Sequence, residues 1–285
     1  MPVELYRLII NKGTDPTYTF TIEDNGGNQA PSLNGPADIS EKPLEILNGT
    51  LIIDEPQWDV TIADGGGDFY LPNLNEVQAS SGSGAIELRQ GVLRIDGDDT
   101  GLILDGLLHI NGGTFDMDDD ANNGNNFIRY GASGNAEIRV SDGELTVGSQ
   151  IRRATTSVSG ILNYNQTGGT VIVGQNAAPV TSRGVLEVMN AESNFTYTGG
   201  SLTLVRQNGS TTVPSLRITP STSDVVSGQV INIGNTNTPV NQNDFGIYSN
   251  INLRHLNIGG TNSPIAKIFG VALTLDTLTI GNAGN

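Results

Sequence analysis

The sequence predicts an all-β fold, an open-ended parallel β-helix or β-solenoid in which short strands stack coil upon coil. A short phrase of glycine and apolar residues recurs along most of the chain. Glycine makes up 37 of 285 residues, well above its average share of about 7%. No window sustains the 3.6-residue periodicity of an amphipathic helix. Together with a hydrophobic content of 36%, these observations indicate a narrow core with many turns.

The recurring phrase is a glycine followed by large apolar residues two and four positions later. Side chains two positions apart lie on the same face of a strand, so both apolar residues are predicted to face inward. The glycine permits a positive φ or a sharp corner before the strand. The instances are Gly49 with Leu51 and Ile53, Gly91 with Leu93 and Ile95, Gly113 with Phe115 and Met117, Gly143 with Leu145 and Val147, Gly169 with Val171 and Val173, Gly184 with Leu186 and Val188, and Gly200 with Leu202 and Leu204. The intervening residues, expected to face outward, are Ile52, Arg94, Asp116, Thr146, Ile172, Glu187 and Thr203.

The spacing of these phrases agrees with coils of roughly 20 to 30 residues, the usual size in a solenoid. Gly184 lies between Gly169 and Gly200 and is expected to open a second strand within one coil. A globular β-sandwich would also explain short strands and regular turns. It would not explain why one phrase recurs, whereas a solenoid needs the same inward pair and corner in every coil. Further strands are predicted at 85–88, 101–104, 136–140, 161–164 and 216–219.

The two ends of the chain differ in how well they follow the repeat. Residues 1–47 lack the phrase and are expected to form irregular first coils or a cap, and 48–285 are assigned to the β-helix coils. Residues 271–281 still alternate in the manner of a repeat. We therefore expect further coils of the same polypeptide to follow.

Charge and composition limit the partners. With 14 basic and 30 acidic residues the net charge is −16, which argues against nucleic acid, because a phosphate backbone requires clustered cations. There is no cysteine, so disulfides are excluded. No run of 18 apolar residues occurs, so membrane insertion is not expected.

Two acidic segments are candidate Ca²⁺ sites. Asp96, Asp98 and Thr100, with glycine following at position 101, match the oxygen donors in the first half of an EF-hand loop. Leucine stands where the bidentate glutamate of that loop would be. The second segment offers Asp116, Asp118 and Asp120. Solvated acidic turns are the alternative interpretation, and no other cofactor is expected.

No residue is assigned a catalytic role. His109 and His255 each stand between apolar neighbours in predicted strands and are expected to point outward. Arg152 and Arg153 are expected to form an exposed basic pair in a loop. Asn and Thr side chains are expected to stack on their counterparts in neighbouring coils.

The segments 142–148, 168–174 and 199–204 resemble coils of the autotransporter-like right-handed parallel β-helix repeats in giant bacterial surface adhesins of the Bacteroidetes type. The resemblance covers residues 45–285 and is architectural. It implies a right-handed helix, export by type IX secretion through an outer-membrane translocon, an extracellular place on the bacterial cell surface, and a role in attachment or gliding. The signal peptide and C-terminal sorting domain of that class are missing from this sequence, which departs from the pattern unless the chain is an internal fragment.

These observations favour a non-enzymatic structural and adhesive segment of a large exported protein, with surface glycans as further candidate partners. The alternative is a polysaccharide-acting enzyme or tailspike-like depolymerase, which would need converging carboxylates in a groove. A carbohydrate-binding module is a third hypothesis.

Overall fold

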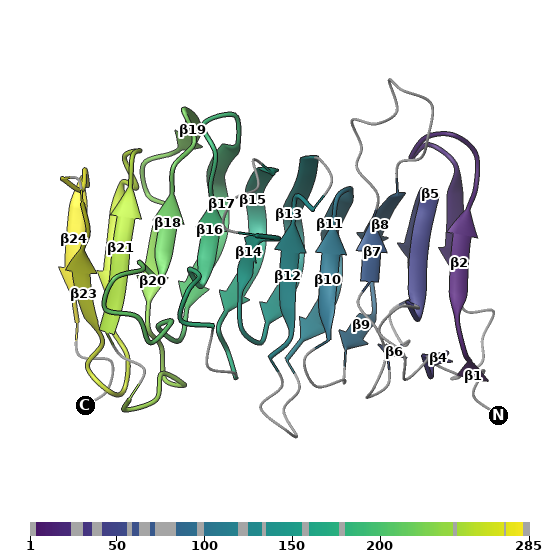
Figure 1. The fold of residues 1–285 in the computed structure, drawn as a ribbon, viewed down its shortest axis with the longest axis horizontal. Helices are drawn as coiled ribbons and strands as arrows, with labels where there is room; N and C mark the ends of the chain where they lie inside the picture. The colour runs from purple at the N-terminus through teal and green to yellow at the C-terminus, as the bar shows by residue number, and fades with distance from the viewer. Residues whose placement is uncertain are drawn as a thin grey trace.

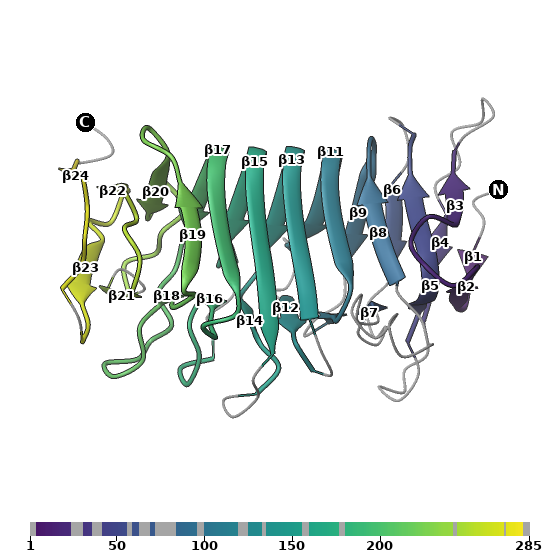
Figure 2. The ribbon, with the colours of Figure 1, turned by 90° about the horizontal axis from the view of Figure 1, so that it is seen from above.

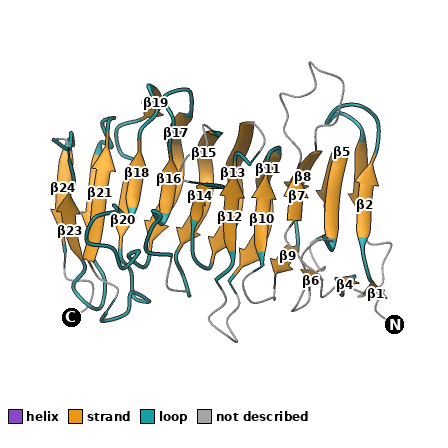
Figure 3. Ribbon diagram, in the orientation of Figure 1, coloured by secondary structure: helices purple, strands orange, loops and turns teal. Residues whose placement is uncertain are grey.

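The computed structural model describes residues 4–23, 31–35, 42–55, 59–62, 69–71, 84–95, 100–118, 125–132, 135–155, 160–176, 180–241, 244–270 and 272–281. These residues form 24 β-strands and no helix (Figure 3). All strand pairings between them are parallel. The strands stack along one axis, with the two chain ends at opposite ends of the stack (Figure 1). The structure confirms the all-β, parallel part of the prediction and is consistent with a β-solenoid.

The strands fall into three ladders that run along the stack. The first ladder contains β2 (Leu8–Asn11), the start of β5 (Leu44–Ile53), β7 (Phe69–Leu71), β10 (Gly101–Leu104), β12 (Phe127–Tyr130), β14 (Ile151–Arg153), β16 (Leu186–Val188), β18 (Leu216–Ile218), β21 (Asp244–Ser249) and β23 (Ile265–Ile268).

The second and third ladders share four long strands, which lie side by side in Figure 2. The second contains β3 (Thr19–Ile22), the end of β5, β8 (Gly84–Leu88), the first halves of β11 (Leu107–Met117), β13 (Asn135–Val147), β15 (Ile161–Val173) and β17 (Asn194–Leu204), and β19 (Thr222–Val225). The third contains β1 (Glu4–Leu5), β4 (Ser32–Leu33), β6 (Asp59–Ile62), β9 (Val92–Ile95), the second halves of the long strands, β20 (Val230–Ile233), β22 (His255–Ile258) and β24 (Thr277–Ile280).

Glycine makes the bend at which each long strand passes from the second ladder to the third. Gly143 and Gly200 have φ values of 75° and 81°. A Cβ atom on Gly143 would lie 2.3 Å from the carbonyl oxygen of Gly113, and one on Gly200 would lie 2.2 Å from that of Gly169. The bends therefore stack so closely that each coil needs a glycine there, for φ and for space.

The core is a set of inward columns in register. In the second ladder Leu108, Ile138, Tyr164 and Phe195 lie one above another, and all four have no exposed surface. The rings of Tyr164 and Phe195 stack with their centroids 5.1 Å apart. Each buried side chain of this size contributes about 1.5–3 kcal/mol, so the apolar alternation read from the sequence supplies the main stabilisation.

The repeat prediction is refined in two places. Gly49 leads into the second ladder, whereas Gly184 precedes β16 of the first ladder, which confirms that it opens a second strand within a coil. The outward positions Ile52, Thr146 and Glu187 are buried, with exposed fractions of 4%, 6% and 0%. At these three positions the outward face of the strand is therefore covered by other residues of the chain.

Polar stacking between coils is confirmed. Asn257 donates a hydrogen bond to Oδ1 of Asn232 at 3.0 Å, and Ser201 donates one to Oγ1 of Thr170 at 3.3 Å. In both pairs the side chains lie on adjacent strands of the third ladder. No helix in the described part of the chain is long and apolar enough to cross a membrane.

Candidate functional site

The six candidate Ca²⁺ ligands are only partly placed by the structure. Asp96, Asp98 and Asp120 lie outside the described residues. Thr100 is 2% exposed, and its backbone N–H donates a hydrogen bond to Oδ1 of Asn126 at 2.9 Å. This contact ties the start of β10 to the neighbouring coil.

Asp116 and Asp118 do lie together. Oδ1 of Asp116 accepts the backbone N–H of Asp118 at 3.0 Å, and Oδ2 accepts a hydrogen bond from Nε of Arg94 at 3.3 Å. The positive charge beside Asp116 is therefore that of Arg94, which lies on the adjacent strand β9. Within the described ranges, no group of three or more His, Asp or Glu side chains is placed to hold a metal ion.

A polar cluster surrounds His109 on the outer surface of the second ladder. Glu87 and Arg139 are the register neighbours of His109 on β8 and β13. Nε2 of His109 lies 3.0 Å from Oγ of Ser141, and Nδ1 lies 3.9 Å from Oε1 of Glu87. Burial lowers the pKa of His109, the charge of Glu87 opposes this, and the charge of Arg139 adds to it. The imidazole is therefore neutral at pH 7, the form that can accept a proton.

Glu87 is held as a carboxylate. Burial raises the pKa of Glu87, but hydrogen bonds from Arg89 and Asn111 and the charge of Arg89 outweigh it and leave the pKa below its ordinary value. Serine, imidazole and carboxylate thus follow one another across three strands, in the order of a nucleophile, a base and an orienting acid. The contact of 3.9 Å is an ion-pair distance and longer than a hydrogen bond. The hydroxyl of Ser141 donates a hydrogen bond to Oδ1 of Asn111 at 2.9 Å, so in this structure its proton points to Asn111 and not to His109.

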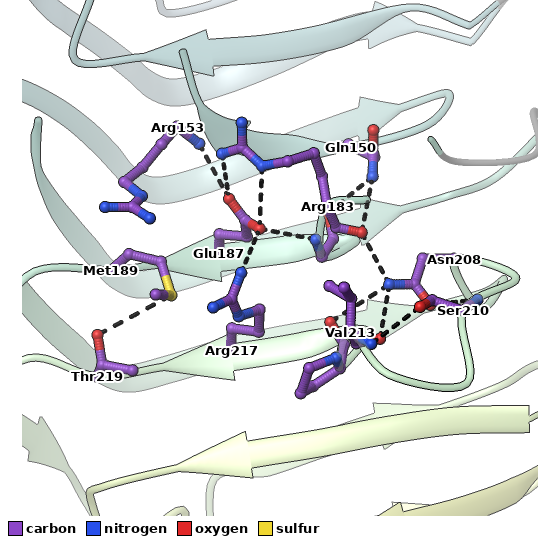
Figure 4. A network of polar contacts seen from close by, with 12 residues as sticks. Gln150, Arg153, Arg183, Glu187, Met189, Asn208, Ser210, Val213, Arg217 and Thr219 are labelled. Carbon is purple, nitrogen blue, oxygen red and sulfur yellow. Dashed lines mark hydrogen bonds and ion pairs between the residues drawn. The ribbon is translucent and has the colours of Figure 1, made fainter. Parts of the chain in front are cut away.

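An extensive buried polar network surrounds Glu187 in the first ladder (Figure 4). Its carboxylate has no exposed surface and forms ion pairs with Nη2 of Arg183 at 2.5 Å and Nη1 of Arg217 at 3.1 Å. It also accepts the backbone N–H groups of Gly184 at 2.7 Å and Arg153 at 3.3 Å. Burial raises the pKa of Glu187, but these hydrogen bonds and the charges of both arginines outweigh burial and lower it overall.

Buried amides continue this network into the loop before β16. Gln150 donates to the carbonyl oxygens of Arg183 at 3.3 Å and Gly184 at 2.9 Å. Asn208 donates to the carbonyl oxygen of Arg183 at 2.8 Å and to that of Val213 at 2.9 Å. Both amides are 1% exposed. They satisfy loop carbonyls that would otherwise be buried without a partner, and the network thus fixes three neighbouring coils.

Arginines also mark the outer face of the first ladder. Arg129 of β12 and Arg152 of β14 are register partners, and their guanidinium carbons lie 5.7 and 4.7 Å from the centroid of the Phe127 ring. Further along, Glu187 pairs in register with Arg217, and Arg217 with Tyr248. We call Arg129, Arg152 and Arg217 the arginine column. The prediction of an exposed basic pair in a loop was wrong, because Arg152 and Arg153 belong to β14 and are half-buried.

A small pocket of about 130 Å³ lies at the C-terminal end of the same face. Lys267 and Asp244 form an ion pair of 2.5 Å on its wall. Its lining combines hydroxyl, amide, charged and aromatic groups, namely Gln207, Gly209, Ser210, Thr211, Asp244, Gly246, Lys267 and Phe269.

The sequence contained one usable sign of the buried network. Val185, directly before β16, and Leu186 and Val188 within it place apolar residues on both faces of this segment, a pattern typical of a strand covered on both sides. A glutamate within such a strand has to be buried with partners. The arginine column had no such sign, because its strands are three or four residues long and their register is set by loops of different lengths.

No protein-family model, no curated protein and no solved structure matches this chain.

Proposed function

We propose that this chain is a right-handed parallel β-helix that serves as a non-enzymatic structural and adhesive segment of a large exported protein on the bacterial cell surface, acting in attachment or gliding. A right-handed path is supported by the strong preference of parallel strand connections for that hand. The lack of cysteine suits a chain that passes an outer-membrane translocon unfolded. Without cysteine, no disulfide can form before transport and hold the chain in a folded state.

The observation that carries this proposal is the continuity of the three ladders. The third ladder alone joins eleven strands without a break in pairing. At about 4.8 Å per strand it spans about 50 Å. Bending such a rod would separate hydrogen-bonded strands on one side and compress the packed core on the other. Stiffness and length are therefore properties of the fold itself.

The last coil presents apolar residues that another parallel coil could cover. Leu278 and Ile280 pair in register with the buried Leu256 and Ile258, yet they are 50% and 75% exposed. The corresponding positions are buried in the coils from β11 to β22, so a coil stacked on β24 would bury Leu278 and Ile280 as well.

Electron microscopy of the purified chain and of two chains fused in tandem tests the structural part. At concentrations low enough to keep the chain monomeric, we expect straight rods whose length doubles in the tandem protein. Display of the chain on cells of a non-adherent bacterium tests the adhesive part, and we expect greater surface attachment than with a display scaffold alone. Compact particles, or tandem proteins that bend freely at every coil, would overturn the proposal.

The enzyme alternative is favoured by one observation, the row formed by Ser141, His109 and Glu87. Its test is incubation of the chain with esterified and carboxylated polysaccharides, followed by analysis for released acid or shortened chains. A His109→Ala variant is the control. Release that the wild-type chain catalyses and the variant does not would establish an enzyme.

A further inference from the structure

We propose that the pocket formed by the loop 205–215 and by strands β21 and β23 binds a single neutral sugar ring at the end of a surface glycan. The proposal rests on the adhesive part of the proposed function, for which it names the ligand class and the site. The pocket has a volume of about 130 Å³, whereas sites for drug-sized ligands measure roughly 300–1,000 Å³. It therefore accommodates one ring and not an oligosaccharide.

Gln207 contributes a buried hydrogen-bond donor to this pocket. Its side chain is 8% exposed and lines the pocket. Oε1 of Gln207 accepts the backbone N–H of Gly209, which fixes the orientation of the amide, because only its oxygen can accept. The amide NH₂ forms no hydrogen bond with any residue that the structure describes. A buried amide donor normally has a partner, so the molecule that occupies the pocket should accept a hydrogen bond from Gln207.

The two strands contribute an ion pair with groups left to bind a ligand. Nζ of Lys267 lies 2.5 Å from Oδ2 of Asp244. Oδ1 of Asp244 accepts no hydrogen bond from the described part of the chain, and two of the three ammonium protons of Lys267 remain available. The two charges cancel, so the pocket favours a ligand without net charge. Hydroxyl groups can bind both members of the pair without separating them.

Phe269 supplies an aromatic surface at a fixed position. A Cβ atom on Gly246 would lie 2.7 Å from Cε2 of Phe269, so the ring lies directly on the bare backbone of β21. The backbone N–H of Phe269 donates to the carbonyl oxygen of Ile247 at 2.8 Å. The side chain is half-buried and lines the pocket. Its ring therefore offers an apolar surface on which the C–H face of a sugar can pack.

The loop side of the pocket is held in place before any ligand binds. Asn208 donates to the carbonyl oxygen of Val213 at 2.9 Å and to that of Arg183 at 2.8 Å (Figure 4). Oγ of Ser210 accepts the backbone N–H of Val213 at 2.9 Å. A site that is already ordered loses less conformational entropy on binding.

A sugar ring matches these features together. Each hydroxyl both donates and accepts, so neighbouring hydroxyls can accept from Gln207 and Lys267 and donate to Asp244 while the C–H face covers the aromatic ring. A zwitterionic amino acid would have to break the ion pair to use both charges. A purely apolar ligand would leave the amide of Gln207 without a partner, which costs free energy.

Binding of the methyl glycosides of glucose, galactose, mannose and N-acetylglucosamine to the intact chain tests the inference, measured by saturation-transfer NMR and titration. We expect at least one to bind saturably with a dissociation constant of about 1 mM, since a single ring makes few contacts. Gln207→Glu keeps an acceptor for Gly209 but replaces the free donor by an oxygen, and should weaken binding about tenfold. The matched control is Gln229→Glu, which adds the same charge directly before β20 and should bind as the wild type does.

Phe269→Leu tests the aromatic surface without adding a charge to the loop. We expect binding to weaken about fivefold, because the ring is replaced by a smaller apolar group. The matched control is Phe20→Leu, at a side chain that is 42% exposed in an early coil, and it should leave binding unchanged. Free alanine, the zwitterionic alternative, is expected not to bind. Thermal unfolding followed by circular dichroism checks that each variant is folded.

Four outcomes would overturn the inference: no binding of any of the four glycosides, unchanged binding in both pocket variants, equal losses in the pocket variants and their controls, or tighter binding of alanine than of every glycoside. Electron microscopy and attachment of displaying cells report separately on the proposed function. Rods that promote attachment without binding a glycoside would refute the sugar site alone. A chain that forms no rods would refute the proposed function whichever glycoside it binds.

Discussion

Glu187 shows how strongly one buried charge depends on its partners. The carboxylate has two arginines and two backbone N–H groups around it and no exposed surface. Removing one partner of such a buried pair leaves an uncompensated charge and typically costs about 3–5 kcal/mol. We expect Glu187→Gln to lower the free energy of unfolding by about 3 kcal/mol, measured by urea denaturation followed by circular dichroism.

The matched control for Glu187→Gln is Asp244→Asn. Asp244 also forms a salt bridge of 2.5 Å, but the side chains of Lys267 and Asp244 are 53% and 45% exposed. Exposed pairs of this kind contribute about 0–1 kcal/mol. Equal losses in both variants would show that the Glu187 network does not depend on burial.

The same carboxylate makes stability depend on acid. The pKa of Glu187 is lower in the folded chain than its ordinary value, so the unfolded chain binds a proton first as the pH falls. The stabilisation is fully present above a pH of about 4.5 and is lost as the pH falls through the folded-state pKa. We expect the urea midpoint of the wild type to decrease from pH 5 to pH 3 more steeply than that of Glu187→Gln. Parallel curves would contradict this.

Burial of single residues could be predicted from the sequence where the alternation of side chains along a strand alone decides which of them face inward. Leu145 and Val147 were expected to face inward and are fully buried. Glu187 was expected to face outward and is buried, because its partners Arg183 and Arg217 come from a loop and from the next coil. Contacts of that kind depend on register between coils, which strand alternation does not contain.

At the scale of the elements, the glycine bend is the feature that each long strand requires. Gly143 has φ of 75°, and a Cβ there would lie 2.3 Å from the carbonyl oxygen of Gly113. Gly228 has φ of 99° and no heavy atom within 4 Å of such a Cβ. We expect Gly228→Ala to lose about 1–2 kcal/mol from backbone strain alone. Gly143→Ala should lose clearly more, because two stacked coils must also move apart.

Urea denaturation of the two alanine variants separates backbone strain from crowding. Both positions have positive φ, so the difference between the two losses reports the close approach of the coils. A loss at Gly143 no larger than that at Gly228 would show that the stacked bends can relax. Hydrogen exchange should then also be unchanged in β11 and β13.

Elements of the second and third ladders could be predicted because their long strands contain the glycine phrase, with the glycine at the bend between the two ladders. The first ladder could be predicted only in part. β10 and β18 match the strands expected at 101–104 and 216–219, and the phrase at Gly184 led to β16. The three residues of β14 are too few to show an alternation and were expected to form a loop. The candidate Ca²⁺ ligands followed from spacing along the chain, whereas the Glu187 network and the arginine column arise from residues about 23–35 positions apart that the coils bring together.

At the scale of the whole molecule, the two end coils differ in side-chain exposure from the central coils, β11 to β20. Ile268 and Ile280 continue inward columns formed by the buried Ile247 and Ile258, yet they are 62% and 75% exposed. The opposite end presents Phe20, which pairs with the buried Leu51 and is 42% exposed. Both ends therefore combine apolar surface with strand edges that accept another parallel strand.

These ends predict that the isolated chain associates end to end. The first and third ladders begin with β2 and β1 and close with β23 and β24, so a second chain can continue both with the same strand direction. Such head-to-tail contacts do not close and produce open chains of molecules. We expect sedimentation velocity to show species that grow with concentration, and Ile268→Lys/Ile280→Lys to shift them toward the monomer. Val180→Lys places a lysine at a side chain that is 47% exposed in the middle of the rod and should leave the distribution unchanged. Monomers at all concentrations, or an equal shift with Val180→Lys, would show that the end coils do not govern association.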